Sequence, residues 1–167
     1  MSAAGVVPGY LVRVARDTDH QAIRELTVGV YVGEGYAGPH YVPTLADVEG
    51  RAAHTELLVA DGGGQVVGAV ALAASGGPYA ELAGPGEAVF RMLVVDPQWR
   101  GRGVAQALVQ ACLERARSAG CQRMVISTEP IMHAAHRLYQ RMGFARDPGR
   151  DWTPVPGVDL LAYVIDL

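Results

Sequence analysis

Alternation of hydrophobic and polar residues predicts several β-strands along the chain. The clearest is 87–96, which alternates at first and then becomes apolar on both faces, as expected for a strand that enters the centre of a domain. Residues 62–64 are three consecutive glycines, which favour a hairpin turn between two such stretches. The remaining strands are predicted at 10–16, 56–61, 65–74, 123–127, from Phe144 onward and at 159–166.

Apolar residues three and four positions apart predict helices between these strands. The main helix spans 104–119, where Val104, Leu108 and Ala111 share one face, and Gly120 is suited to end it. Three other helices are predicted: from the capping residues 17–19 to about Tyr31, over 45–53 after Thr44, and from Pro130 to Gly143.

Glycine and proline mark the connections. Residues 1–9 are expected to form a flexible tail, and 75–86 and 147–157 are expected to be loops. The segment 33–43 follows Tyr31 and carries Tyr36, His40 and Tyr41. These rings either pack on the surface or contact a small polar ligand, and the sequence leaves both interpretations open. Hairpins combined with helical crossovers predict a mixed α/β fold in a single domain, 1–167.

The composition limits the ligands and the kinds of chemistry that can be expected of this chain. The 167 residues carry a net charge of −3, which disfavours binding to nucleic acid. All 14 basic residues are arginine, so a lysine nucleophile and a phosphate-binding lysine are excluded. The two cysteines, Cys112 and Cys121, have no metal-ligand spacing, and no metal is expected. No signal pattern or long apolar segment is seen, so a cytoplasmic protein without membrane partners is expected.

The candidate chemistry centres on residues 92–108. An apolar strand stops at Asp96-Pro97, a loop with two glycines and two arginines follows, and a helix then begins. This arrangement directs backbone N–H groups and the positive end of a helix dipole at one point, which favours binding of an anion such as a phosphate.

Three kinds of phosphate loop were compared with this stretch. A Walker A loop requires the missing lysine, and a dinucleotide-binding fingerprint requires a third glycine where the chain has Gln106. The third kind is the coenzyme A loop R/Q-x-x-G-x-G/A of the GNAT superfamily of N-acetyltransferases, which Arg100-Gly101-Arg102-Gly103-Val104-Ala105 closely resembles. The apolar stretch before it resembles the fourth strand of that family.

A second motif supports this resemblance. Leu138-Tyr139-Gln140-Arg141-Met142-Gly143-Phe144 is similar to the family's L-Y-x-x-x-G-F segment. The order of predicted elements is also similar. The resemblance implies a central mixed, mostly antiparallel, twisted sheet of about seven strands flanked by about four helices.

The resemblance also implies which residues hold acetyl-CoA. The pyrophosphate would bind to the backbone N–H groups of the loop, assisted by the two arginine side chains. The pantetheine arm would lie along the fourth strand, where a main-chain N–H could also polarise the thioester carbonyl. The cofactor-binding residues implied are Leu93, Val94, Val95, Arg100, Gly101, Arg102, Gly103, Val104, Ala105 and Gln106.

Roles in catalysis follow from the same resemblance. Tyr139 occupies the position of the general acid that protonates the leaving thiolate. Glu87 is the leading candidate for general base, because period-two counting places it on one strand face with Val89, Arg91, Leu93 and Val95. Pairing with Arg91 and exposure to solvent are its structural alternatives. The other candidates for the base are Glu129, His40, His133 and His136.

The sequence departs from the family at one position. Many members carry an asparagine near the start of the last helix, where its amide contacts coenzyme A, and this chain has Met132 there. That contact is either absent or supplied by Ser127, Thr128 or His133.

The function implied is transfer of the acetyl group of acetyl-CoA to a primary amine of a small molecule or protein, by direct attack in a ternary complex. A non-catalytic acyl-CoA-binding module and a generic nucleotide-binding domain are the alternatives. Tyr31, Tyr36, Tyr41 and Arg91 are candidate substrate-binding residues. A homodimer is common in the family and is a further expectation.

Overall fold

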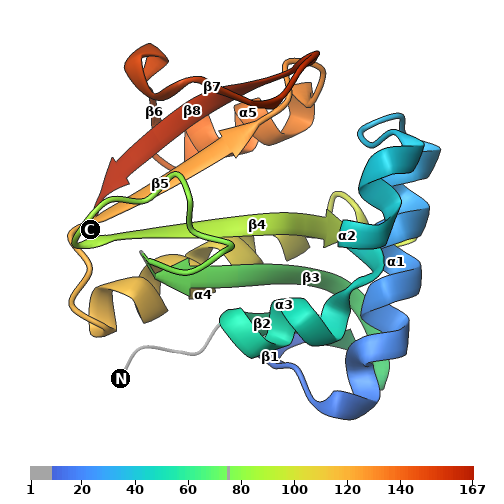
Figure 1. Cartoon of the computed structure of the whole chain (residues 1–167). Coiled ribbons are helices and arrows are strands. Elements are labelled where there is room, and N and C mark those ends of the chain that lie inside the picture. The colour runs from blue at the N-terminus through green and yellow to red at the C-terminus, as the bar shows by residue number, and fades with distance from the viewer. Residues whose placement is uncertain (1–8, 75) are drawn as a thin grey trace.

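The computed structural model describes residues 9–74 and 76–167 (Figure 1). In this part of the chain the strands are β1 (Leu11–Val14), β2 (Glu56–Gly62), β3 (Gln65–Ala74), β4 (Glu87–Val95), β5 (Arg123–Thr128), β6 (Ala145–Arg146), β7 (Trp152–Val155) and β8 (Val158–Asp166). The α-helices are α1 (His20–Gly33), α2 (Val42–Ala46), α3 (Val48–His54), α4 (Val104–Ser118) and α5 (His133–Arg141).

The strands form one mixed sheet. Its order is β1-β2-β3-β4-β5-β8-β6, and β7 pairs with β8 beside this path. Every pair is antiparallel except β4 and β5, which are parallel. The predicted mixed, mostly antiparallel sheet is therefore confirmed, with eight strands and five α-helices among the described residues in place of about seven and four.

Helices cover both faces of the sheet. On one face, α4 and α5 bury a cluster that includes Leu108, Cys112, Phe90 and Tyr139. On the other face, α1 and α3 bury a second cluster that includes Ile23 and Val48. Because both faces are covered, the middle strands are apolar on both sides, as the sequence of β3 and the end of β4 predicted.

Three predicted elements differ from the structure. The helix predicted over 45–53 is divided at Asp47, which leaves the helical conformation at ψ 68 and accepts a hydrogen bond from the N–H of Gly50, so that Asp47 and not Thr44 caps α3. The helix predicted from Pro130 begins at His133. The predicted loop 147–157 contains β7, an edge strand that tolerates Pro154 because it pairs on one side only.

The parallel strands β4 and β5 are paired at their amino ends and separate toward their carboxyl ends. Bridge partners join the two strands only at Glu87 with Arg123 and at Ala88 with Met124. Beyond these residues β4 and β5 diverge, as Figure 1 shows, and their carboxyl ends lie at the same side of the sheet. The loop after β4 leads into α4 at that side, so the divergence and the glycine loop lie together.

Candidate functional site

The loop between β4 and α4 presents a row of free backbone donors. Gly101 and Gly103 adopt φ angles of 77° and 80°, and Gly103 is the N-cap of α4. The helical hydrogen bonds begin with the N–H of Ala107, which donates to the carbonyl of Gly103. Within residues 9–74 and 76–167, the six N–H groups from Gly101 to Gln106 have no acceptor. These groups, at the positive end of a 15-residue helix, form a site for a polyanion.

The arginine side chains of this loop are engaged elsewhere. Arg100 forms an ion pair with Glu34, which follows α1, and both side chains are partly exposed. The guanidinium of Arg102 lies 4.5 Å from the centre of the Trp99 ring. Tyr10 donates a hydrogen bond of 3.3 Å to the carbonyl of Arg102. The sequence did not indicate Tyr10 or Glu34 as supports of this loop, because they come from distant segments, whereas Trp99 directly precedes Arg100.

The edge of β4 that faces β5 is open beside the loop. From Val89 to Val95, β4 has a bridge partner on its β3 side alone in the described part of the chain. An open strand edge offers backbone donors and acceptors to an extended, peptide-like ligand. Leu93, Val94 and Val95 therefore lie where a pantetheine arm could pair with the strand.

A β-bulge interrupts β4 at the same place. Ala69 and Ala71 of β3 face Val94 and Arg91 of β4, so β4 contains one extra residue between them. Met92 has a φ of 55°, and no other non-glycine residue in the described chain has a positive φ. Such strain in a buried strand is typical of functional sites.

The bulge overturns one prediction. Ala88 and Phe90 contact the α4 face before the bulge, whereas Leu93 and Val95 pack against that face after it. Leu93 and Val95 therefore do not share a face with Glu87, Val89 and Arg91. Strict period-two counting failed because the extra residue exchanges the two faces of the strand.

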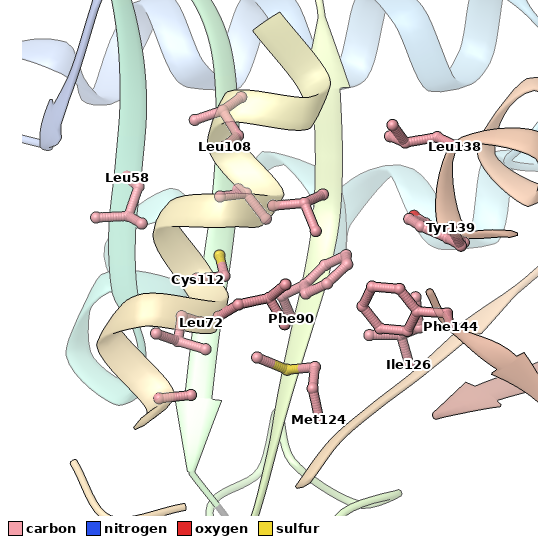
Figure 2. Packing of buried hydrophobic residues seen from close by; sticks show 14 of the residues in the cluster. Leu58, Leu72, Phe90, Leu108, Cys112, Met124, Ile126, Leu138, Tyr139 and Phe144 are labelled. Carbon is pink, nitrogen blue, oxygen red and sulfur yellow. The ribbon is translucent and has the colours of Figure 1, made fainter. Parts of the chain in front are cut away.

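Tyr139 points from α5 toward β4 (Figure 2). Its side chain is 5% exposed and packs against Phe90, Phe144 and Tyr163, with ring centres 5.5 to 6.0 Å away. Burial raises the pKa of the phenol well above its ordinary value. No hydrogen bond joins the hydroxyl to the described residues. Tyr139 is thus a fully protonated group held by apolar packing on the β5 side of the open edge.

Tyr31 of α1 lies on the opposite side of this edge. Its hydroxyl donates a hydrogen bond of 3.3 Å to the carbonyl of Leu93, next to the bulge. Burial raises the pKa of Tyr31, and negative charge on Tyr139 or Tyr41 would raise it further, whereas Arg91 lowers it.

The other candidate substrate residues divide into two groups. Arg91 donates a hydrogen bond of 3.0 Å to the hydroxyl of Tyr41, so the structure brings these two together. Tyr36 packs edge-on against Tyr31, and burial together with the neighbouring Glu34 raises the pKa of its hydroxyl. Tyr36 therefore lies near the ion pair between Glu34 and Arg100 beside the glycine loop.

Glu87 lies at the other end of β4. Both of its carboxylate oxygens accept 2.8 Å hydrogen bonds from Arg150, and one also accepts from the N–H of Gly84. Arg123 lies 3.7 Å away. The Arg150 guanidinium is the main reason that the pKa of Glu87 is lower than usual, although burial opposes this shift. The expected partner Arg91 is not among these contacts. A carboxylate so occupied is a weak base, and its contacts favour a structural role.

We expect Glu87→Gln to lower the free energy of unfolding at pH 7 by about 1–3 kcal/mol, because one member of a largely buried charged network is lost. The pKa of Glu87 is lowered by folding, so its carboxylate stabilises the protein above the unfolded-state pKa of about 4.3. This stabilisation decreases as the pH falls through the lower pKa of the folded state. Urea unfolding at pH 7 and pH 3 should show a large difference between variant and parent only at pH 7, and equal midpoints at pH 7 would contradict this role.

Glu129 follows β5 directly, at the end where the parallel pair diverges. Its side chain is half-buried, and burial raises its pKa. No ion pair or hydrogen bond involves its carboxylate in the described chain. Its carbonyl lies 3.0 Å from Nε2 of His136, which is one turn before Tyr139 on α5. Glu129 is therefore close in the fold to Tyr139, and its carboxylate is free.

The remaining candidates for the base have other surroundings. Burial lowers the pKa of His136, whose ring lies edge-on to His133 at 5.9 Å. His40 is exposed and belongs to the turn before α2. Met132 is the N-cap of α5, and its sulfur accepts a hydrogen bond of 3.4 Å from Thr128. Trp152 donates to the hydroxyl of Ser127, so Met132, Thr128 and Ser127 contact one another or the β7 segment.

An open groove in the described chain lies away from this site. It has a volume of about 830 Å³ and lies between the end of β3, the start of β4 and the C-terminal half of α4. Small residues such as Ala73, Ala88 and Ala116 line it, and it is wide open to solvent. Because its wall contains no row of free N–H groups, the loop at 101–106 and not this groove is the candidate anion site. None of the described helices has the length and apolar character needed to cross a bilayer.

Comparison with known proteins agrees with this geometry. The family model of the acetyltransferase (GNAT) family matches residues 19–144. Over 94 residues the chain is 39% identical to N-acetyltransferase family 8 member 2 of Rattus norvegicus, an alignment that covers 56% of this chain and 40% of that protein. The chain spans less than half the length of such curated relatives.

Solved structures share the fold. An acetyltransferase of the GNAT family from Staphylococcus aureus has a TM-score of 0.76 at 14% identity, covering 95% of this chain and 99% of that one. A putative acetyltransferase from Salmonella typhimurium, solved with its cofactor acetyl-CoA, has a TM-score of 0.71 at 22% identity, covering 95% of this chain and 94% of that one.

Proposed function

The chain belongs to the GNAT acetyltransferase family, and from this premise we propose that it transfers the acetyl group of acetyl-CoA to a primary amine of a small molecule or protein in a ternary complex. One observation carries the proposal: six free N–H groups at the start of α4 adjoin an open, bulged edge of β4. This pair of features matches two adjacent parts of the cosubstrate, the pyrophosphate and the peptide-like pantetheine arm.

The residues present fit acetyl-CoA. The N–H groups from Gly101 to Gln106 would hold the pyrophosphate without requiring a buried cation. The backbone of Leu93 to Val95 would hold the arm, and a main-chain N–H near the bulge would polarise the carbonyl. Acetyl-CoA supplies an activated acyl group on a thiol leaving group. Arg100 and Arg102 would reach the phosphates only by leaving Glu34 and Trp99.

Tyr139 is proposed as the general acid. Its raised pKa keeps the phenol protonated at neutral pH, which is the form that an acid requires. The packing against Phe90, Phe144 and Tyr163 fixes the ring, so that its hydroxyl can donate a proton to the leaving thiolate at one defined place.

Glu129 is proposed as the general base in preference to Glu87. Its carboxylate is free of ion pairs with the described residues, and burial raises its pKa, which makes it the stronger base. It would accept the proton that the incoming ammonium group loses, directly or through one water molecule. Glu87 has neither property, because Arg150 and Gly84 occupy its oxygens.

The activity is tested by mixing the protein with acetyl-CoA and pools of primary amines and measuring free thiol. Amine-dependent release of CoA together with an acetylated amine supports the proposal. Tight binding of acetyl-CoA with no amine-dependent release from any pool would instead indicate a non-catalytic acyl-CoA-binding module. Stronger stabilisation by ATP than by CoA would indicate a different nucleotide site.

The glycine loop provides a sharper prediction. Gly103→Ala should raise the KM for acetyl-CoA about tenfold, because an alanine at φ 80° costs about 1–2 kcal/mol and the loop must turn its N–H groups to relieve that strain. Gly120→Ala is the matched control, since Gly120 has a φ of 86° just after the other end of α4. Both variants should unfold at lower urea concentration, but only Gly103→Ala should weaken acetyl-CoA. Equal KM values for the two variants would count against the loop as the phosphate site.

A further inference from the structure

We infer that the acceptor amine carries a carboxylate and that Arg91 binds this carboxylate, an inference that rests on the proposed function. The observation behind it is the partnering of arginine side chains. Among residues 9–74 and 76–167, every arginine that is buried or half-buried has a carboxylate within 4.0 Å, with two exceptions, Arg51 and Arg91. The paired arginines are Arg13, Arg24, Arg123, Arg146 and Arg150.

Two tyrosine side chains orient the guanidinium of Arg91, where we infer that the acceptor amine binds. Its guanidinium donates to the hydroxyl of Tyr41 at 3.0 Å and lies 5.5 Å from the centre of the Tyr79 ring. Both partners are neutral, so they orient the group without cancelling its charge. A guanidinium has five N–H donors in a planar fork, and one bond to Tyr41 leaves an edge for a bidentate carboxylate. The side chain is partly exposed, so a ligand can reach it.

Arg51 adds positive charge behind this position. Its side chain is 1% exposed, and its Nη1 donates to the carbonyls of Thr44 and Leu45 at 3.2 Å. Burial lowers its pKa, and the nearby Asp47 favours the charge only weakly from beyond ion-pair distance. An arginine nevertheless stays protonated in proteins. A buried cation with only neutral hydrogen-bond partners is costly, and an anion bound nearby lowers that cost.

The position on β4 fits a small amino acid. Arg91 lies two residues before Leu93, whose carbonyl accepts a hydrogen bond from Tyr31 beside the bulge, so the two positions are at most about 7 Å apart. The charges of Arg91 and Arg51 also act to lower the pKa of Tyr31. An amine directed at the thioester beside Leu93 would therefore have its carboxylate within reach of Arg91. A neutral alkylamine would leave both guanidinium charges without an anion.

The test compares amino acids with their own carboxamides as acetyl acceptors, at equal concentrations and saturating acetyl-CoA. Each pair keeps the amine and the side chain and differs in the charge of one group. The amine of a carboxamide is less basic and more of it is neutral, so intrinsic reactivity favours the amide. We expect the parent protein nevertheless to prefer the acids, and Arg91→Gln to lower the kcat/KM ratio of acid to amide about tenfold. Tyr41→Phe should lower this ratio less.

Arg24→Gln is the matched control, because it also removes one guanidinium charge, but from α1 and from an existing pair with Glu49. It should leave the ratio of acid to amide unchanged. Equal or greater use of carboxamides by the parent protein, or an equal loss for acids and amides in Arg91→Gln, would overturn the inference. If no acceptor of either kind is acetylated, the thermal stability of the CoA complex is compared in the presence of N-acetyl amino acids and of their amides. Greater stabilisation by the acids would support the inference, and equal stabilisation would overturn it.

These outcomes separate the inference from the function on which it rests. Acetylation of neutral alkylamines and carboxamides, with amino acids excluded, would leave the proposed activity standing and remove the role of Arg91. If the parent protein did not bind acetyl-CoA at all, the proposed activity itself would be wrong.

Discussion

Tyr139→Phe is expected to lower kcat for acetyl transfer by about 10²–10⁴, the usual contribution of a positioned general acid. The phenol is the group proposed to protonate the leaving thiolate beside the open edge of β4, and phenylalanine keeps the ring but removes the proton. Because the described residues make no hydrogen bond to this hydroxyl, urea unfolding should be little changed. The KM for acetyl-CoA should also be nearly unchanged, since the loop and strand remain intact.

Tyr163→Phe is the matched control for this prediction. Tyr163 is a second buried tyrosine, 3% exposed, and its ring lies 6.0 Å from that of Tyr139 in the same aromatic cluster. Its variant should retain kcat within about threefold, far from the loss expected for a missing acid. If Tyr139→Phe also retains kcat, the proton comes from another donor, and the role assigned to Tyr139 is wrong.

Glu129→Gln is the second variant with a large expected effect, a loss of about 10² in kcat/KM for the amine near neutral pH. The parent should gain activity with rising pH through the pKa of Glu129, which burial raises above the ordinary value for glutamate, because only the carboxylate form accepts a proton. In Glu129→Gln this rise of kcat/KM with pH should be absent. The pH dependence of kcat/KM, measured at saturating acetyl-CoA, tests both statements.

Glu87→Gln is the control for Glu129→Gln, and the two variants should show opposite behaviour. Glu87→Gln is destabilised but keeps the pH limb and most of the activity, whereas Glu129→Gln is stable and slow. If Glu87→Gln were stable and its kcat/KM no longer rose with pH, Glu87 would be the general base and the assignment of Glu129 would be wrong. That result would also mean that Arg150 leaves Glu87 during the reaction.

Local sequence patterns predicted the features that depend on neighbouring residues. The strand at Gln65–Ala74 and the start of α4 at Val104 agree with their predicted bounds, because apolar periodicity and glycine spacing are local signals. The backbone of the glycine loop follows from the same spacing, since Gly101 and Gly103 adopt the positive φ angles that other residues avoid.

Features that depend on distant residues could not be predicted in this way. The bulge at Met92 places a methionine at a positive φ, which its residue type disfavours, and tertiary pairing with β3 imposes it. The guanidinium that occupies both oxygens of Glu87 comes from Arg150, 63 positions away, so local sequence did not indicate that this carboxylate is engaged. The pairing of Arg91 with Tyr41 likewise joins segments 50 positions apart.

The central claim is that the loop at 101–106 and the open edge of β4 bind acetyl-CoA. Backbone amide chemical shifts of the isotope-labelled protein, followed by NMR during titration with CoA, test it most directly. We expect the largest shifts at the amides from Gly101 to Gln106 and at Leu93 to Val95, with little change around Ala73, Ala88 and Ala116 in the distant groove. Shifts concentrated in that groove, with the amides of the loop unchanged, would contradict it.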